Sequence, residues 1–206
     1  MQATTLAILL ALGAGTAAAA DLVRDDFSKP ASGWQNKAAS RSSDLGFAVY
    51  TDSGKYQMTP VSDDTFGFIS APRQAADGNV QIEADLFLYA GIGAGAAGLA
   101  CRFKDHGNFY GFLARGDATL LIVKVKDGKP TPLAQGKVDS VMAGSVDTRL
   151  RAECTGDRLR FTARDGSRLE ARDTELTTGR SGLLVLGEKM AGTSASFDNF
   201  VLATSP

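Results

Sequence analysis

The chain has 206 residues, of which 44% are hydrophobic and 22% are charged. This composition is ordinary for a globular protein with a substantial core, and the length suits one domain. The formal net charge is −1, which argues against a basic surface for nucleic acid. A single His and two Cys exclude His-rich metal sites and four-Cys zinc sites.

The first segment, residues 1–20, carries no charge and contains a short apolar run from Leu6 to Leu12. Small residues follow and end at Ala18-Ala19-Ala20, directly before Asp21. This order is typical of a signal peptide with an A-x-A cleavage site. A membrane anchor is disfavoured because the apolar run is too short to cross about 30 Å of hydrocarbon. We therefore predict a signal peptide over 1–20, a mature domain over 21–206 without a membrane span, and a periplasmic or secreted location.

The mature chain alternates between apolar and polar residues in short runs, which is typical of β-strands. The clearest run is Val80–Tyr89, and several later runs are joined by Asp-Gly turns, which favour hairpins. Many short strands without a helical period predict an all-β sandwich or barrel. Further strands are expected at Leu99–Phe103, Asn108–Ala114, Ala118–Val125, Arg149–Cys154, Arg158–Ala163, Arg168–Ala171, Gly182–Leu186 and Ser196–Leu202, with loops at Lys29–Asp44, Asp63–Gly78 and Pro130–Asp147.

The two cysteines, Cys101 and Cys154, fall in strand-like runs at positions that alternate with the polar residues. Leu99, Cys101 and Phe103 are expected on one core-facing side. Two neighbouring strands that face the core could bring the two thiols together, and an exported protein meets an oxidising compartment. We predict a Cys101–Cys154 disulfide, with two buried free thiols as the alternative.

Several short motifs occur in chain order, namely Asp25-Asp26-Phe27-Ser28, Gly98–Phe103, Asn108–Phe112, Arg149–Gly156, Gly179-x-x-Gly182 and Phe197-Asp198-Asn199-Phe200. Together these motifs carry a resemblance to a known superfamily. The chain resembles the concanavalin A-like lectin/glucanase superfamily, specifically bacterial laminin-G-like jelly rolls, which are related to the 3-keto-disaccharide hydrolase-like group. The resemblance implies a two-sheet antiparallel jelly-roll sandwich with adjacent first and last strands. It implies function only loosely, because such folds host carbohydrate binding, glycoside cleavage, adhesion and sensing.

Polar residues that alternate with the core positions are expected on an outward sheet face. Planar polar groups beside an aromatic ring suit the hydroxyls and the C–H face of a sugar. The alternative is a solvated face with weak ion pairs. The candidate ligand-binding residues are Glu83, Asp85, Arg102, Tyr110, Arg151 and Glu153, with Arg102 at the centre.

Catalysis has a partial signal. Family-16 glycoside hydrolases of this superfamily carry an E-x-D-x-x-E strand, and this chain has Glu83-Ala84-Asp85 without the third acid. A retaining glycosidase needs two carboxyl groups flanking the bond. The strand Ala97–Arg102 echoes only part of the 3-keto-disaccharide hydrolase pattern. We therefore assign no catalytic residue and leave enzymatic activity open.

A structural Ca²⁺ is implied by the resemblance, since many relatives hold one where the first and last strands meet. The matching positions are Asp198 for the carboxylate, Gly54 for a backbone carbonyl, and Asp25 or Asp26 for further oxygens. Ca²⁺ needs about 6–8 oxygen ligands. The alternative is that Asp198 and Asn199 bond local backbone.

Three remaining features receive structural interpretations. Gly93–Gly98 matches the GxGxxG dinucleotide fingerprint, but a strand rather than a helix is expected after it. His106 is expected in an exposed turn, with a catalytic base as the alternative. Trp34 is expected as a lid over the edge of the core, with a sugar platform as the alternative.

The sequence thus favours an exported, non-catalytic domain that binds a glycan or another cell-envelope polysaccharide. A glycoside-active enzyme and a protein-interaction or structural envelope module are the alternatives.

Overall fold

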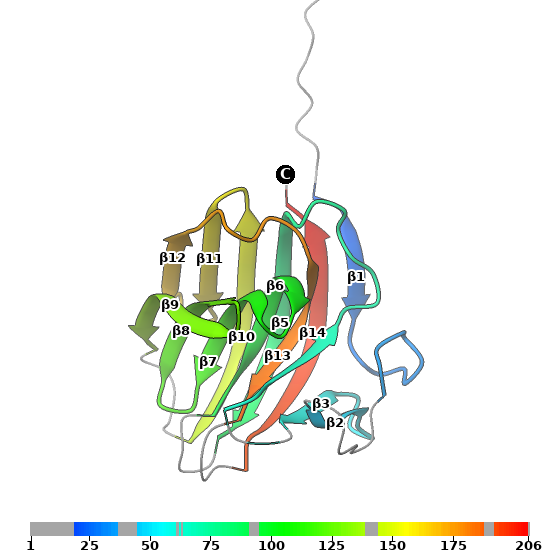
Figure 1. Ribbon diagram of the computed structural model, residues 1–206. Helices are drawn as coiled ribbons and strands as arrows, with labels where there is room; N and C mark the ends of the chain where they lie inside the picture. The colour runs from blue at the N-terminus through cyan, green and yellow to red at the C-terminus, as the bar shows by residue number, and fades with distance from the viewer. Residues whose placement is uncertain are drawn as a thin grey trace, which may run out of the picture.

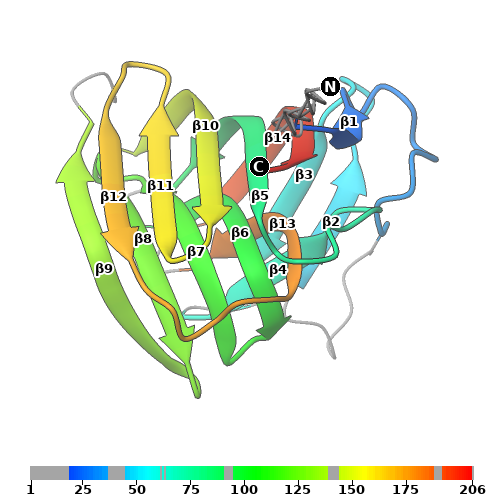
Figure 2. The ribbon, with the colours of Figure 1, turned by 90° about the horizontal axis from the view of Figure 1, so that it is seen from above.

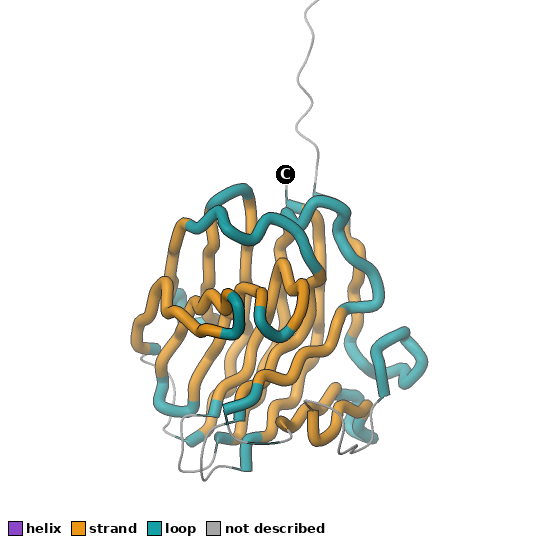
Figure 3. The backbone as a smooth tube through the Cα atoms, in the orientation of Figure 1, coloured by secondary structure: helices purple, strands orange, loops and turns teal. Residues whose placement is uncertain are grey.

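The computed structural model describes residues 19–36, 45–60, 62, 64–90, 95–138, 144–187 and 192–205. All regular structure in these residues is β-strand (Figure 3). No helix in this part of the chain has the length and apolar character needed to cross a membrane. The strands are β1 (Asp21–Asp25), β2 (Leu45–Tyr50), β3 (Tyr56–Pro60), β4 (Phe66–Ser70), β5 (Val80–Tyr89), β6 (Ala96–Asp105), β7 (Asn108–Arg115), β8 (Thr119–Lys126), β9 (Lys129–Lys137), β10 (Ser145–Thr155), β11 (Arg158–Ala163), β12 (Arg168–Arg172), β13 (Arg180–Leu186) and β14 (Ser194–Thr204).

The strands form two antiparallel sheets that pack face to face (Figures 1 and 2). The larger sheet has the order β12-β11-β10-β5-β14-β3-β2, and β1 pairs with β14. The smaller sheet has the order β4-β13-β6-β7-β8-β9. The first strand therefore lies beside the last, and Thr204 N donates to Ala20 O at 3.0 Å. This is the jelly-roll sandwich that the sequence predicts.

The core lies between the sheets, where the inward side chains of both layers meet. Strand β5 shows why the sequence predicts the core correctly. Ile82, Ala84, Leu86 and Leu88 are buried, and the residues that alternate with them are not. Period-two alternation is what a sheet with one packed face requires. Across the layers, the rings of Phe112 on β7 and Phe161 on β11 lie 5.7 Å apart.

The predicted disulfide is present and joins the two layers. Cys101 on β6 and Cys154 on β10 are both buried, and their Cα atoms lie 6.7 Å apart. The sequence predicts that the two strands are neighbours, but they are not paired in one sheet. They belong to opposite sheets and face each other across the core.

Two of the predicted loops contain strands. Phe66–Ser70 pairs with β13, and Lys129–Lys137 pairs with β8. Neither segment alternates in the way that the prediction required. Strand β4 is apolar on both faces, and β9 is a largely exposed edge strand with two prolines, where missing amide donors are tolerated.

The outer face of the smaller sheet also carries apolar side chains, which changes the position of Phe103. Phe103 was expected beside Leu99 and Cys101, but it packs in a second cluster on the opposite face. There its ring stacks on that of Phe68 at 3.8 Å, and the Arg180 guanidinium lies 5.4 Å from its centroid. A β-bulge between Cys101 and Asp105 inverts the alternation.

Candidate functional site

The outer face of the larger sheet brings together most of the predicted ligand residues. In the β5–β10 pairing, Arg151 lies opposite Glu83 and Arg149 lies opposite Asp85. Glu153 follows on the same face of β10 and pairs with Arg160 of β11 at 3.1 Å. Residues directly opposite in antiparallel strands share a face. Glu83, Asp85, Arg151 and Glu153 therefore lie on one surface, which we name the charged face together with Arg149 and Arg160.

Arg102, the expected centre of this surface, lies elsewhere. It belongs to β6 of the smaller sheet and is 1% exposed. Its φ of +51° places it at the β-bulge, where its side chain turns inward instead of outward. The guanidinium donates to Gly78 O, Leu176 O and Asn79 Oδ1 at 3.0–3.3 Å. The prediction that Arg102 is an outward ligand residue is wrong, because a bulge interrupts the alternation of inward and outward side chains on which it depended.

Tyr110 is also absent from the charged face. It lies on β7 of the smaller sheet and is fully buried. Its hydroxyl donates to Asp173 Oδ1 at 2.6 Å and accepts a hydrogen bond from Leu176 N. Burial and the neighbouring carboxylate raise the pKa of Tyr110. Its ring faces the core, so the prediction of an aromatic ligand platform at Tyr110 is wrong.

The residue at the actual centre of the charged face is Arg149. Its guanidinium donates to Glu83 Oε2 at 2.8 Å and to Asp85 Oδ1 at 3.1 Å. It also donates to the backbone oxygen of Asn199, whose side-chain amide in turn donates to Asp85 Oδ2 at 2.8 Å. The sequence could have predicted this position, since Arg149 lies two residues before Arg151 and therefore on the same face of the strand.

The same network holds Asp85 in its ionised form. Partial burial raises the pKa of Asp85, but hydrogen bonds from Asn199 and Arg149 outweigh it and the pKa lies below its ordinary value. A glycosidase general acid needs the opposite shift, so that it is protonated near neutral pH. Glu83 and Asp85 are both engaged by Arg149. Their environment therefore does not favour the acid/base pair of a glycosidase.

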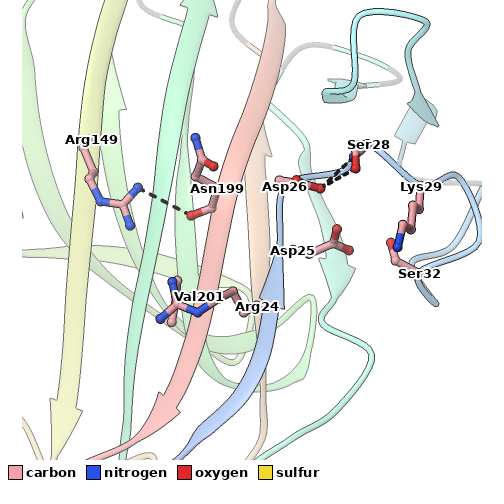
Figure 4. Close-up of a pocket in the computed structure, with 9 residues that line it drawn as sticks. All are labelled: Arg24, Asp25, Asp26, Ser28, Lys29, Ser32, Arg149, Asn199 and Val201. Carbon is pink, nitrogen blue, oxygen red and sulfur yellow. Dashed lines mark hydrogen bonds between the residues drawn. The ribbon is translucent and has the colours of Figure 1, made fainter.

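Beside this network lies a cavity of about 500 Å³, which we name the Arg24 pocket (Figure 4). Its volume falls in the range of small-molecule sites. It forms where β1 and the loop after it meet β14 and β10, so the pairing of the two chain ends creates it. The lining residues are Arg24, Asp25, Asp26, Ser28, Lys29, Ser32, Arg149, Asn199 and Val201.

A second cavity, of about 290 Å³, lies on the other side of Asp85 and is named here the Phe87 pocket. Phe87 is 47% exposed, and Tyr89, two residues along β5 on the same face, is 55% exposed. Their cross-strand neighbours are short: Ser196 lies opposite Phe87, and Ser194 opposite Tyr89. The lining residues are Lys55, Asp85, Leu86, Phe87, Asp147, Arg164, Ser196 and Asp198.

The proposed calcium ligands are distributed between these two pockets. Asp26 lines the Arg24 pocket and Asp198 lines the Phe87 pocket. Gly54 lies beside Ser28, next to Asp26. Asp198 Oδ1 accepts from Asn199 N at 2.7 Å, which is the local contact that the alternative interpretation expects. Among the residues described, no group of three His, Cys, Asp or Glu side chains is placed to hold a metal.

Calcium binding stays a prediction, and it has a direct test. If Asp198 takes part in a Ca²⁺ site, adding Ca²⁺ to chelator-treated protein at 100 times the Kd should stabilise the fold by about 2.7 kcal/mol. That corresponds to a Tm rise of about 5–10 °C for a domain of this size. Asp198→Asn should abolish the rise. Equal melting curves in Ca²⁺ and in chelator would contradict the prediction.

The structure also places His106, Trp34 and the end of the GxGxxG segment. His106 is exposed in the β6–β7 turn, as predicted. Trp34 is 5% exposed, and its Nε1 donates to Asp25 Oδ2 at 2.8 Å, so the lid interpretation is confirmed. The GxGxxG segment leads into β6 and not into a helix. A Cβ on Gly98 would lie 1.9 Å from Phe112 O, so this glycine permits the close approach of strand β7.

Comparison with known proteins supports the architecture. No protein-family model matches the sequence, and no curated protein matches it. The fold is similar to that of carbohydrate-binding module CBM66 from Bacillus subtilis, with a TM-score of 0.62, 24% identity, and coverage of 84% of this chain and 96% of that one. A Bacillus subtilis protein of unknown function with a galectin-like fold has a TM-score of 0.61, 14% identity, and coverage of 91% and 98%. The GH43 protein BlXynB from Bacillus licheniformis has a TM-score of 0.63 and 15% identity, and the match covers 88% of this chain but only 39% of that enzyme. At these identities the similarity establishes the fold.

Proposed function

We propose that this chain is a non-catalytic carbohydrate-binding domain, and that the Phe87 pocket is its principal sugar site. The observation that carries the proposal is the pair of exposed rings on β5, Phe87 and Tyr89. They are the exposed large hydrophobic side chains among the residues described. An uncovered aromatic face packs well against the C–H face of a sugar ring.

The surroundings of the rings supply groups for sugar hydroxyls. Ser196 and Asp198 border the pocket from β14, and Asp147 and Arg164 border it from the opposite side. Lys55 adds an ammonium group from the β2–β3 turn. A few polar groups around an apolar platform give orientation and specificity to a small-molecule site. The similarity of the fold to the carbohydrate-binding module CBM66 supports the same proposal.

Export is part of the proposal. Residues 1–18 lie outside the described residues, but β1 begins at Asp21, the first residue after the expected cleavage site. A disulfide that joins the two sheets suits an oxidising compartment. A periplasmic or secreted domain would meet polysaccharides of the cell envelope or of the surroundings.

Replacing Phe87 with Ala should weaken glycan binding at least tenfold, because the variant loses the stacking face. The measurement is a glycan-array screen on residues 21–206, followed by titration of the bound glycans. The Tm should stay within a few degrees of the wild type, because Phe87 is half exposed and surface changes have small effects. Arg168→Ala, an exposed change on the distant strand β12, is the matched control and should bind normally.

Three outcomes would contradict the proposal. If Phe87→Ala binds glycans as tightly as the wild type, the Phe87 pocket is not the sugar site. A silent array would favour a protein-interaction module instead. Release of reducing sugar from any bound glycan would revive the glycoside-active alternative, including the 3-keto-disaccharide hydrolase relationship.

A further inference from the structure

The Arg24 pocket and the Phe87 pocket are adjacent, and one hydrogen-bonded network separates them. Asp85 lines the Phe87 pocket, whereas Arg149 and Asn199 line the Arg24 pocket. Asp85 accepts from both of these residues, at 3.1 and 2.8 Å. A chain of sugars seated on Phe87 can therefore continue over Asp85 into the Arg24 pocket.

The two pockets differ in charge. Three cations line the Arg24 pocket, namely Arg24, Lys29 and Arg149. Arg149 is already compensated by Glu83 and Asp85. The two cations that remain for a ligand are thus Arg24 and Lys29.

Arg24 and Lys29 are only weakly compensated by the protein. Arg24 pairs with Asp21 at 2.8 Å, but this pair is largely exposed and such pairs contribute about 0–1 kcal/mol. The backbone oxygen of Lys29 accepts a hydrogen bond from Ser32 N at 3.2 Å, but within the described part of the chain its ammonium group has no hydrogen-bond or ion-pair partner. Its ammonium acts on Asp26 only through the longer-range attraction that helps to lower the pKa of that carboxyl, after the hydrogen bonds from Ser28.

The carboxylates of the pocket are largely engaged by the protein itself. Asp25 is 8% exposed and accepts from Phe27 N at 2.8 Å and from Trp34 Nε1 at 2.8 Å. Asp26 Oδ1 accepts from both N and Oγ of Ser28, at 3.1 and 2.7 Å. Asp26 Oδ2 receives no hydrogen bond from the described residues, so one exposed carboxylate oxygen remains beside the two cations. The cationic donors with spare hydrogen-bonding capacity are Arg24 and Lys29.

We infer that the Arg24 pocket is a second subsite, which binds a carboxylate group of an acidic polysaccharide whose neighbouring sugar lies on Phe87. The inference rests on the proposed function and narrows it to glycans that contain uronic acids. A guanidinium and an ammonium are the side chains that pair best with a carboxylate. The subsite should lose affinity with salt, because its cations are solvent-accessible.

The test compares oligogalacturonate with the same oligomer after reduction of its carboxylates to alcohols. Isothermal titration at low salt should show at least tenfold tighter binding of oligogalacturonate. The double variant Arg24→Gln/Lys29→Gln should bring the affinity for oligogalacturonate down to that of the reduced oligomer. Lys104→Gln/Lys129→Gln removes the same charge from exposed strand ends of the other sheet and should leave the preference intact.

The outcomes separate this inference from the proposed function. Equal affinity for the charged and the reduced oligomer overturns the subsite, and so does failure to bind oligogalacturonate. In either case, neutral glycans that bind the wild type and lose affinity in Phe87→Ala would still support the proposed function. Unchanged preference in the Arg24/Lys29 double variant also overturns the subsite.

Discussion

Replacing Arg102 with Ala should destabilise the domain by about 2–4 kcal/mol. The side chain is 1% exposed and donates to two backbone carbonyls and to Asn79 Oδ1. Each acceptor left unpaired in a buried site costs about 1–3 kcal/mol. The variant also relieves the burial of a cation, which lowers the pKa of Arg102 in the wild type. This relief offsets part of the loss, which is why the expected total is smaller than the sum of three bonds.

The destabilisation has a structural origin in the segment between β12 and β13. Arg102 holds Leu176 O, and Tyr110 holds Leu176 N and Asp173, so both residues fasten this segment to the smaller sheet. Gly179, at the end of this segment, also packs closely on the backbone of Arg102. A Cβ at position 179 would lie 2.4 Å from the Arg102 carbonyl carbon. Loss of the guanidinium should therefore loosen residues 173–179 first.

Urea unfolding followed by circular dichroism measures the effect. For a domain of this size, the expected loss corresponds to a Tm decrease of about 5–15 °C. Lys104→Ala, on the same strand but exposed, is the control and should unfold near the wild-type midpoint. Arg102→Lys keeps the charge but cannot reach three acceptors, so it should fall between the two. A wild-type midpoint for Arg102→Ala would contradict the anchoring role of its guanidinium.

The contrast between β5 and β6 explains how far the sequence could predict the fold. In β5 one face is apolar and buried, and the other carries Glu83, Asp85 and the exposed rings of Phe87 and Tyr89, so the alternation assigns both faces correctly. In β6 both faces are apolar and a bulge at Arg102 shifts the parity. The position of a bulge cannot be predicted from a run of apolar residues. Counting alternate residues along β6 therefore predicts an outward Arg102.

The candidate site shows the same division. Glu83, Asp85, Arg151 and Glu153 were placed on one face by parity alone, and parity would also have included Arg149. The Arg24 pocket was not predictable in this way, because it forms only when β1 pairs with β14. The alternation of β5 also places the Phe87 and Tyr89 rings on its outer side, but their exposure depends on short neighbours on β14 such as Ser196, which the alternation does not reveal.

Removing the disulfide should have a comparably large effect on stability. Cys101→Ala/Cys154→Ala opens a covalent loop in which the cysteines are 53 residues apart. The chain-entropy treatment gives about 4 kcal/mol for a loop of this length, because the bond restricts the unfolded chain. The expected Tm decrease is about 8–16 °C.

The bond also has a specific place in the fold, which sharpens the test. It joins β6 to β10 and is the disulfide that links the two sheets among the residues described. The double variant should therefore unfold at a lower urea concentration in both reducing and oxidising buffer, whereas the wild type should approach it only when it is unfolded and refolded with reductant. Each single variant leaves one buried thiol and should be no more stable than the double variant. Equal unfolding midpoints for wild type and double variant in oxidising buffer would mean that packing between the layers, and not the cross-link, sets the stability of the sandwich.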